Sequence, residues 1–253
     1  MARPTVSAVI IARDESAHLA DCLESLGFVD EVVVVVDASS RDETEAIARA
    51  GADRVLVREF DDFAGQRNAG LSQAHGDWVL SIDADERVTP ELAQEIQTMT
   101  IDLTRDEVAY RLPIRSVVLG RAFRASGTQN DRPVRLFRRD LGRWEGRVHE
   151  TVRVQGRVGE MRANLTHRTI PDMRTFLHKL DKYTTLEAEQ FAREGRPWRH
   201  ADLLVRPAWT FAKLYLGKSG FRDGLEGLMF CSLSAVSVAV RHWKHRELLR
   251  GPA

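Results

Sequence analysis

Three carboxylates lie within four residues of one another, at Asp83, Asp85 and Glu86, directly after the largely apolar run 78–82. Carboxylates this close repel one another unless a positive group lies between them, and a hard divalent cation such as Mg²⁺ or Mn²⁺ prefers oxygen ligands of this kind. An apolar run stopped by charges predicts a buried parallel strand, whose last residues reach the edge where α/β sheets bind ligands. The stretch therefore predicts a metal–phosphate site, with a solvated acidic turn as the alternative.

A second acidic strand end lies at Asp37, after the apolar run 32–36. A carboxylate at such a position accepts hydrogen bonds from a base or a ribose hydroxyl in nucleotide-binding α/β folds, and Asp42 adds a second carboxylate nearby. Ser40 and Glu43 have the spacing of a capping box, so the simpler interpretation is a turn that begins a helix.

Basic side chains are the third candidate group. Arg67 precedes the acidic strand by one strand–helix unit and can counter a diphosphate, although an exposed ion pair is an equally simple explanation. The segment 134–138 alternates apolar and basic residues, which predicts a half-exposed strand. We expect Arg135 and Arg138 to share one face of that strand, suited to a diphosphate or an anionic acceptor, with a solvated face as the alternative.

The elements that must position these residues alternate between continuous apolar strands and short amphipathic helices. Continuous apolar strands are covered on both faces, so the pattern predicts an α/β fold with a mostly parallel, doubly wound sheet. We expect a nucleotide-binding half over 1–107, an acceptor-side half over 108–170 and a helical extension over 171–253. The expected strands are 6–12, 32–36, 55–57 and 78–82, and the expected helices include 64–74 and one that begins at Thr89 and Pro90.

Composition is that of an ordinary globular chain of 253 residues, with 43% hydrophobic and 29% charged residues and a net charge of zero. The charge is uneven, because residues 1–107 carry 23 acidic and 9 basic side chains while 196–253 carry 4 and 10. Cys22 and Cys231 have neither a disulfide nor a metal-ligand pattern. No hydrophobic segment precedes the first strand, which argues against a secretory signal.

The last fifty residues mix apolar and basic character. The apolar stretch 227–240 has 14 residues, which is too short to span a bilayer. Aromatic and basic residues flank it, as in helices that lie in a membrane interface. We expect peripheral membrane contact, with a helix packed within the protein as the alternative.

The order of these motifs resembles the inverting glycosyltransferases of family 2, which have the GT-A fold. The tail and two further stretches resemble, more narrowly, the branch of lipopolysaccharide core β-glucosyltransferases. Family members more often have Asn where this chain has Arg13. The stretches that carry the family resemblance are 10–15, 37–44, 66–70 and 76–86, and those that carry the narrower one are 135–139 and 148–150.

The resemblance implies roles for individual residues. Asp37 would hold the uracil or other base, Asp83 would face the nucleotide sugar, and Asp85 would bind the cation that bridges the donor diphosphate. Glu15 matches the acidic residue after the first strand. The full set expected to bind the nucleotide sugar is Glu15, Asp37, Asp42, Arg67, Asn68, Asp83, Arg135 and Arg138.

The implied reaction displaces a nucleoside diphosphate from a sugar by an acceptor hydroxyl, with inversion, and it requires a base and a metal. Glu150, in a Val-His-Glu stretch, is our first candidate for the base, and Asp131 is the second. An imidazole can complete the shell around Mg²⁺ or Mn²⁺, which makes His149 and His167 further candidates beside Asp83 and Asp85. The role of Glu86 stays open.

The resulting hypothesis is a metal-dependent enzyme that uses a nucleotide sugar, a UDP-sugar first. The acceptor would be an anionic lipid-linked saccharide on the cytoplasmic face of the membrane, and no nucleic acid is expected as a partner. A sugar-phosphate nucleotidyltransferase is one alternative, but it needs a Gly-rich, Lys-containing loop after the first strand, and residues 12–16 contain neither. A non-catalytic, membrane-docked binding module is the other alternative.

Overall fold

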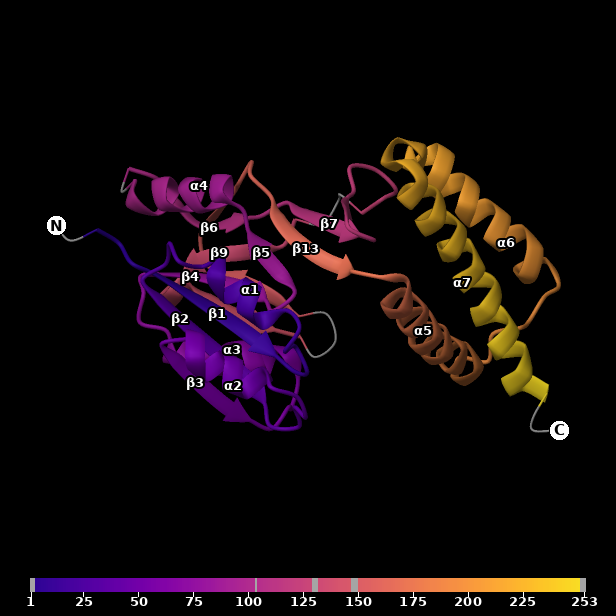
Figure 1. Ribbon diagram of the computed structural model, residues 1–253, viewed down its shortest axis with the longest axis horizontal. Helices are drawn as coiled ribbons and strands as arrows, with labels where there is room; N and C mark the ends of the chain where they lie inside the picture. The colour runs from indigo at the N-terminus through magenta and orange to yellow at the C-terminus, as the bar shows by residue number, and fades with distance from the viewer. Residues whose placement is uncertain (1–2, 103, 129–131, 147–149, 251–253) are drawn as a thin grey trace. The chain divides into compact units, whose positions relative to one another are not determined.

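The computed structural model of the protein describes residues 3–102, 104–128, 132–146 and 150–250. The chain divides into two compact units (Figure 1). Unit 1 consists of residues 1–114 and 131–167, and unit 2 of residues 115–130 and 168–253.

Unit 1 is organised around a mixed sheet that has seven strands within the described ranges, in the order β12-β6-β9-β4-β1-β2-β3. Strands β3, β2, β1 and β4 run parallel, and β9 lies antiparallel between β4 and β6. The four strands expected from the apolar runs are therefore confirmed. The strands are β1 (Val6–Ala12), β2 (Glu31–Asp37), β3 (Arg54–Arg58), β4 (Trp78–Asp83), β6 (Glu107–Arg111), β9 (Val134–Arg138) and β12 (Arg157–Glu160).

The register of the sheet brings the acidic strand ends to one edge. Ile11 pairs with Val35 of β2 on one side and with Asp83 of β4 on the other. Asp37 is the last residue of β2, two positions beyond Val35. Because parallel strands end at the same edge of a sheet, Asp37 and Asp83 both lie at the carboxyl edge, as the sequence predicts.

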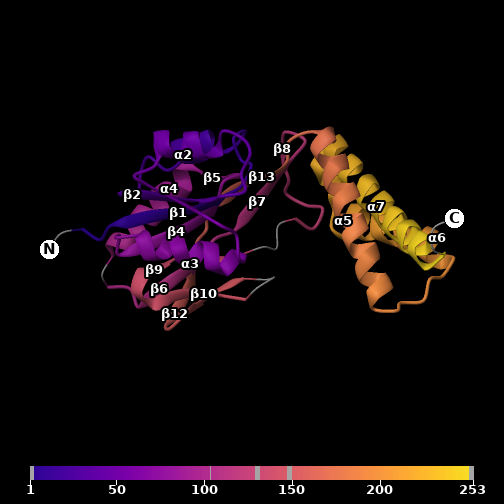
Figure 2. The same cartoon turned by 90° about the horizontal axis from the view of Figure 1, so that it is seen from below.

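Helices cover both faces of the sheet, which is why its strands are apolar throughout. Helices α1, α2 and α4 pack on the face that carries Ile10 and Val34, and α3 packs on the face that carries Val9 and Val33. Figure 2 shows α2 and α4 on one side of β1 and α3 on the other. The helices are α1 (Leu19–Glu24), α2 (Thr44–Gly51), α3 (Phe63–Gln73) and α4 (Pro90–Ile101).

One helix start in unit 1 agrees with the expectation from the sequence, and another differs from it. Thr89 caps α4 by accepting a hydrogen bond from the Leu92 amide, as expected. The predicted capping box of Ser40 and Glu43 is wrong, because no side chain caps α2. The Ser40 hydroxyl instead accepts a hydrogen bond from the Asp14 amide, so it holds the loop after β1.

Two short antiparallel pairings also involve residues of unit 1. Strand β5 (Glu86–Val88) follows the acidic stretch at once and pairs with β13 (Leu165–Ile170). Strand β10 (Gly142–Glu145) pairs with β11 (Thr151–Val154), and a 3₁₀ turn over Arg139–Leu141 joins β9 to β10.

Unit 2 is mainly helical. Helix α7 packs against both α5 and α6, and Phe123, Phe176 and Phe230 lie in a small apolar core. The buried Asp223 carboxylate accepts hydrogen bonds from the Arg124 and Ala125 amides. The elements are β7 (Ile114–Val118), β8 (Arg121–Ala122), α5 (Met173–Arg193), α6 (Ala201–Ala212), a π-helical turn (Lys213–Gly217), a 3₁₀ turn (Gly220–Asp223) and α7 (Gly224–Arg250).

The apolar stretch 227–240 is part of a longer helix than the sequence predicts. Helix α7 has 27 residues, because its basic last turns continue the helix instead of ending it. Within the described residues, the segment Gly220–Arg250 is long and apolar enough to cross a membrane by length and composition alone. Length therefore does not exclude a membrane span, and our expectation on that point was wrong.

Candidate active site

The candidate site lies at the carboxyl edge of the unit 1 sheet. Strand β4 delivers Asp83, β5 begins with Glu86, α3 contributes Arg67, and the antiparallel β9 contributes Arg135. These four side chains form one continuous set of ion pairs.

Asp83 lies between two guanidinium groups. Arg67 Nη2 is 2.6 Å from Asp83 Oδ1, and Arg135 Nη2 is 2.8 Å from Asp83 Oδ2. Burial disfavours the charged carboxylate, but the positive charges of Arg135 and Arg67 outweigh it and hold the pKa of Asp83 below its ordinary value. Asp83 is therefore ionised and fixed in position.

Glu86, whose role the sequence left open, is a buried partner of this pair. Its side chain is 1% exposed, Oε1 lies 3.0 Å from Arg135 Nη2, and Oε2 accepts a hydrogen bond from the Asp83 amide at 2.8 Å. Burial raises the pKa of Glu86 to about 7. One nitrogen of Arg135 thus bridges Asp83 and Glu86, and Glu86 fixes both Arg135 and the backbone of Asp83.

Asp85 lies beside an imidazole. In the pairing of β5 with β13, His167 stands opposite Glu86, and its Nε2 reaches Asp85 Oδ2 at 2.9 Å. Burial opposes protonation of His167, but the hydrogen bond and the negative charge of Asp85 raise its pKa above the ordinary value. Of the two candidate histidines, His167 lies next to the predicted metal ligand, and His149 lies outside the described residues.

Arg67 connects the acidic cluster to the first candidate for the base. Its Nε lies 3.4 Å from Glu150 Oε1, and its Nη1 donates to the Ser81 hydroxyl at 3.1 Å. Its guanidinium also lies over the Trp144 ring, 4.7 Å from the ring centre. Arg67 is 4% exposed, so it is not the exposed ion pair of the alternative interpretation. Asp131 lies outside the described residues.

One oxygen of the buried Asp37 carboxylate accepts hydrogen bonds, and the other is open, which means that it has no hydrogen-bond partner among the described residues. Its Oδ1 accepts hydrogen bonds from the amide and the hydroxyl of Ser39, each at 2.8 Å. Its Oδ2 is buried without a hydrogen-bond partner, although the Arg13 guanidinium lies 3.7 Å away. A buried acceptor without a donor fits a ligand that donates one.

Asp42 and Glu15 belong to the loops beside Asp37. Asp42 accepts hydrogen bonds from the Ser16 amide and from the amide and hydroxyl of Thr44, so its oxygens hold these loops together. Glu15 is half-buried, and its amide donates to the Thr44 hydroxyl. Their placement beside Asp37 follows from the pairing of β1 with β2.

Two predicted site residues, Asn68 and Arg138, have structural partners within the protein. The Asn68 side-chain amide exchanges two hydrogen bonds with the Trp144 backbone, at 2.9 and 3.0 Å, and so anchors β10. Arg138 does not share a face with Arg135, and that expectation was wrong. The two are three positions apart, so their side chains point to opposite faces, and Arg138 lies over the Trp78 ring. Strand β9 is also largely buried, since it is inserted between two other strands.

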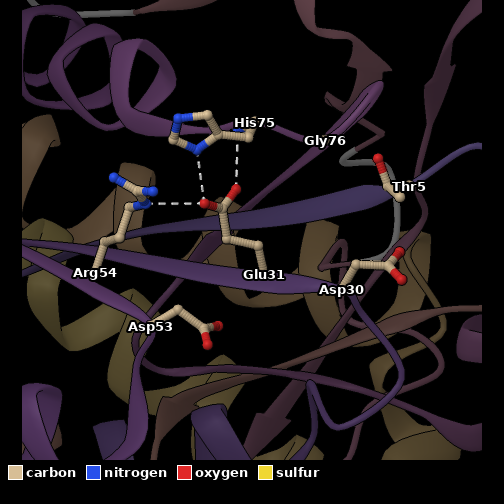
Figure 3. A pocket seen from close by; sticks show the side chains of 7 residues that line it. All are labelled: Thr5, Asp30, Glu31, Asp53, Arg54, His75 and Gly76. Carbon is tan, nitrogen blue, oxygen red and sulfur yellow. Dashed lines mark hydrogen bonds and ion pairs between the residues drawn. The ribbon is translucent and has the colours of Figure 1, made fainter.

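A cavity of about 530 Å³ lies at the opposite edge of the sheet (Figure 3). Thr5 precedes β1, Glu31 begins β2 and Gly76 precedes β4, which places the cavity at the amino ends of the strands. Glu31 there accepts hydrogen bonds from Arg54 and from the His75 amide. The acidic cluster of Asp83, Asp85 and Glu86 does not line this cavity.

The comparison with known families agrees with this geometry. Residues 7–161 match the glycosyl transferase family 2 domain, which is more than half of the chain. The chain belongs to glycosyl transferase family 2. The glycosyltransferase is 31% identical over 252 residues to the lipopolysaccharide core biosynthesis glycosyltransferase LpsC of Rhizobium meliloti (strain 1021), covering 94% of this chain and 93% of that one. It is also 24% identical to an uncharacterized glycosyltransferase of Rickettsia typhi, covering 96% and 87%.

Among solved structures, the glycosyltransferase resembles the mannosyltransferase PcManGT from Pyrobaculum calidifontis, which was solved in complex with GDP-Man and Mn²⁺. The TM-score is 0.51 at 14% identity, over 97% of this chain and 88% of that one. This likeness concerns the fold, which is the GT-A fold that the sequence predicts. The resemblance to lipopolysaccharide core glycosyltransferases is likewise confirmed.

Proposed function

We propose that this glycosyltransferase moves a sugar, with inversion and with the help of a divalent cation, from a nucleoside-diphosphate donor to an anionic lipid-linked saccharide. The observation that carries the proposal is the cluster of Asp83, Asp85 and Glu86 at the carboxyl edge, with Arg67 and Arg135 beside it. Carboxylates for a cation and guanidinium groups for a diphosphate are the pairing that a nucleotide sugar requires.

The residues present fit Mg²⁺ or Mn²⁺. Asp83 and Asp85 supply carboxylate oxygens, and His167 supplies a nitrogen next to Asp85. Over the described ranges, no cluster of three or more His, Cys, Asp and Glu side chains is arranged to hold a metal ion by itself. Mg²⁺ typically binds through one or two carboxylates together with substrate phosphates, so a site completed by the donor suits this donor set. When bound, the cation would stabilise the leaving diphosphate.

Asp85 is the better metal ligand of the two aspartates in this proposal. Both Asp83 oxygens already accept hydrogen bonds from guanidinium groups, whereas Asp85 contacts the His167 imidazole through Oδ2. Asp83 instead keeps Arg67 and Arg135 aligned at the strand end.

The open Oδ2 of Asp37 supports a role in binding the nucleotide base, through a donated N–H of the base. Uracil presents such an N–H, so we propose a UDP-sugar as the first donor to test. The hydrogen bonds from Ser39 hold the carboxylate in place, and they also hold the pKa of Asp37 below its ordinary value. Glu15 and Asp42 support the same loops.

Glu150 is proposed as the base that takes the proton of the acceptor hydroxyl. Its contact with Arg67 holds it within the same network as Asp83, and this contact supports the proposal. The alternative base, Asp131, lies outside the described residues. The acceptor hydroxyl attacks the sugar carbon, the bond to the diphosphate breaks, and Glu150 receives the proton.

The acceptor and location are proposed from two observations. The relative LpsC is named for lipopolysaccharide core biosynthesis, and residues 108–253 carry an excess of basic side chains suited to an anionic lipid-linked saccharide. We propose that the enzyme acts on the cytoplasmic face of the cytoplasmic membrane, as a peripheral protein.

A panel of nucleotide sugars tests this function. Each donor is incubated with the full chain and Mn²⁺ or Mg²⁺, and release of nucleoside diphosphate is measured with and without excess chelator. We expect cation-dependent release from at least one UDP-sugar. Release of inorganic pyrophosphate from a nucleoside triphosphate and a sugar phosphate, without donor turnover, would instead indicate the nucleotidyltransferase alternative.

A further inference from the structure

The water-facing stripe of helix α7 is apolar. Leu225, Met229, Val236 and Trp243 are 69%, 36%, 48% and 47% exposed. They lie at positions i, i+4, i+11 and i+18, which fall on one face of an α-helix. A surface helix of a globular protein normally has polar residues on that face, so the pattern of α7 is inverted.

Helix α6 has the same inversion. Leu204, Val205 and Trp209 are 77%, 63% and 68% exposed, and they too lie on one helical face. The connection between α6 and α7 adds Leu216 and Phe221, which are 64% and 52% exposed. Helices α6 and α7 pack against each other, so one helical hairpin carries all of these side chains. Extensive exposed apolar surface of this kind marks an interaction site.

The charge of the hairpin is complementary to an anionic surface. Lys213, Lys218 and Arg222 are exposed in the connection between the two helices. Two of the acidic groups are used within the fold, since Asp202 pairs with Arg206 and the Asp223 carboxylate binds backbone amides. The segment 196–253 therefore presents mainly positive charge beside its apolar stripes.

Packing against α5 decides between a helix that crosses a bilayer and one that lies on it. Arg241 and Lys244 of α7 form ion pairs with Glu187 and Asp181 of α5, at 2.8 and 2.6 Å. A membrane-spanning α7 would carry the charged helix α5 that packs against it into the bilayer, or would lose that packing. A helix in the plane of the interface keeps α5 in water and buries only the apolar stripe.

We propose that the α6–α7 hairpin docks this enzyme on an anionic phospholipid bilayer. The hairpin lies in the interface, with Trp209 and Trp243 at headgroup level and the connection's basic side chains against lipid phosphates. The proposal deepens the peripheral membrane contact of the proposed function. It names the surface, its orientation and the lipid charge it requires.

The test measures binding of the full chain to vesicles of phosphatidylcholine alone and to vesicles that also contain phosphatidylglycerol. The test variant is Leu204→Ser with Leu225→Ser, and the matched control is Leu177→Ser with Leu186→Ser on α5, where the leucines are 51% and 48% exposed. We expect wild-type binding only to anionic vesicles, weakened by high salt. The test variant loses about tenfold or more in affinity, and the control stays within about twofold.

Four outcomes overturn the proposal. Three are absence of wild-type binding to anionic vesicles, unchanged binding of the test variant, and self-association of the wild type in solution that the test variant abolishes. Retention of the protein in membranes after alkaline carbonate washing would show a spanning helix instead. Cation-dependent donor turnover is measured on the same samples, so that lost turnover with intact vesicle binding counts only against the proposed function.

Discussion

Replacing Arg135 with Met should destabilise the protein, because Asp83 and Glu86 lose the guanidinium group that they share. Its Nη2 lies 2.8 Å from Asp83 Oδ2 and 3.0 Å from Glu86 Oε1, and Arg135 and Glu86 are both buried. A hydrogen bond to a charged group contributes about 1.5–3 kcal/mol, and removing one partner of a buried ion pair costs about 3–5 kcal/mol. We therefore expect Arg135→Met to lower the free energy of unfolding by about 3–5 kcal/mol.

A double-mutant cycle with Glu86→Gln isolates the interaction. Urea unfolding is measured at about pH 9, well above the Glu86 pKa of about 7, for the wild type, both single variants and the double variant. Because Arg135→Met leaves Glu86 as a buried carboxyl without its guanidinium, neutralising Glu86 should restore part of the lost stability. We expect the double variant to be more stable than the sum of the single effects by about 2 kcal/mol.

Arg138→Met is the matched control, because it removes an arginine of the same strand from the opposite face. Its half-buried guanidinium lies over the buried Trp78 ring, a contact worth about 1–2 kcal/mol. Additivity of Arg135→Met and Glu86→Gln within about 0.5 kcal/mol, or equal losses for Arg135→Met and Arg138→Met, would refute the bridging role of Arg135.

Three further predictions concern the base, the nucleotide and acid stability. Glu150→Gln should lower kcat by about 100-fold or more, and an active Glu150→Gln beside an inactive Asp131→Asn would transfer the role of base to Asp131. Asp37→Ala should raise the Kd for UDP in calorimetry by about tenfold, and an unchanged Kd would contradict base binding. The Glu31 side chain is 15% exposed. Burial opposes ionisation of this carboxyl, but hydrogen bonds from Ser7, His75 and Arg54 outweigh it and lower the pKa of Glu31 to about 2. Its stabilisation is therefore complete above pH 4.5 and is lost as the pH falls through 2. In urea unfolding, the free energy of unfolding should therefore fall by about 3 kcal/mol less on acidification in Glu31→Gln than in the wild type. An equal fall in the two proteins would contradict this prediction.

The position of the site could be predicted from the sequence because it depends on strand ends. The apolar runs before Asp37 and Asp83 specify parallel strands, and parallel strands end at one edge of the sheet. No knowledge of the tertiary contacts is needed for that step. The order of the motifs along the chain resembles that of family 2, and the match of residues 7–161 to the family 2 domain agrees with this resemblance.

The partners within the site could not be predicted in the same way, because they depend on register. Arg135 reaches Asp83 only since β9 inserts antiparallel beside β4, and sequence spacing does not reveal that pairing. The face of Arg138, in contrast, follows from the sequence, because residues three apart on a strand point to opposite faces. Ser81 was a usable signal, since a polar residue inside a buried strand needs a partner, here Arg67.

Glu86 and Asn68 show a second limit. Glu86 was the third member of an acidic run, and nothing in the sequence separates a solvated carboxylate from one that receives a guanidinium and an amide. Asn68 belongs to a family motif, yet its amide binds the Trp144 backbone 76 residues away. Contacts between segments so distant in the sequence become visible only in the fold.

The most direct test of the central claim is the cation dependence of donor turnover in Asp85→Asn. In the wild type we expect release of nucleoside diphosphate from a UDP-sugar to require Mn²⁺ or Mg²⁺. Asp85→Asn should lower kcat/KM by about 100-fold or more, because the cation loses its proposed carboxylate ligand. Asp140→Asn, at a residue whose side chain is 80% exposed, should match the wild type. Wild-type turnover and unchanged cation dependence in Asp85→Asn would contradict the account.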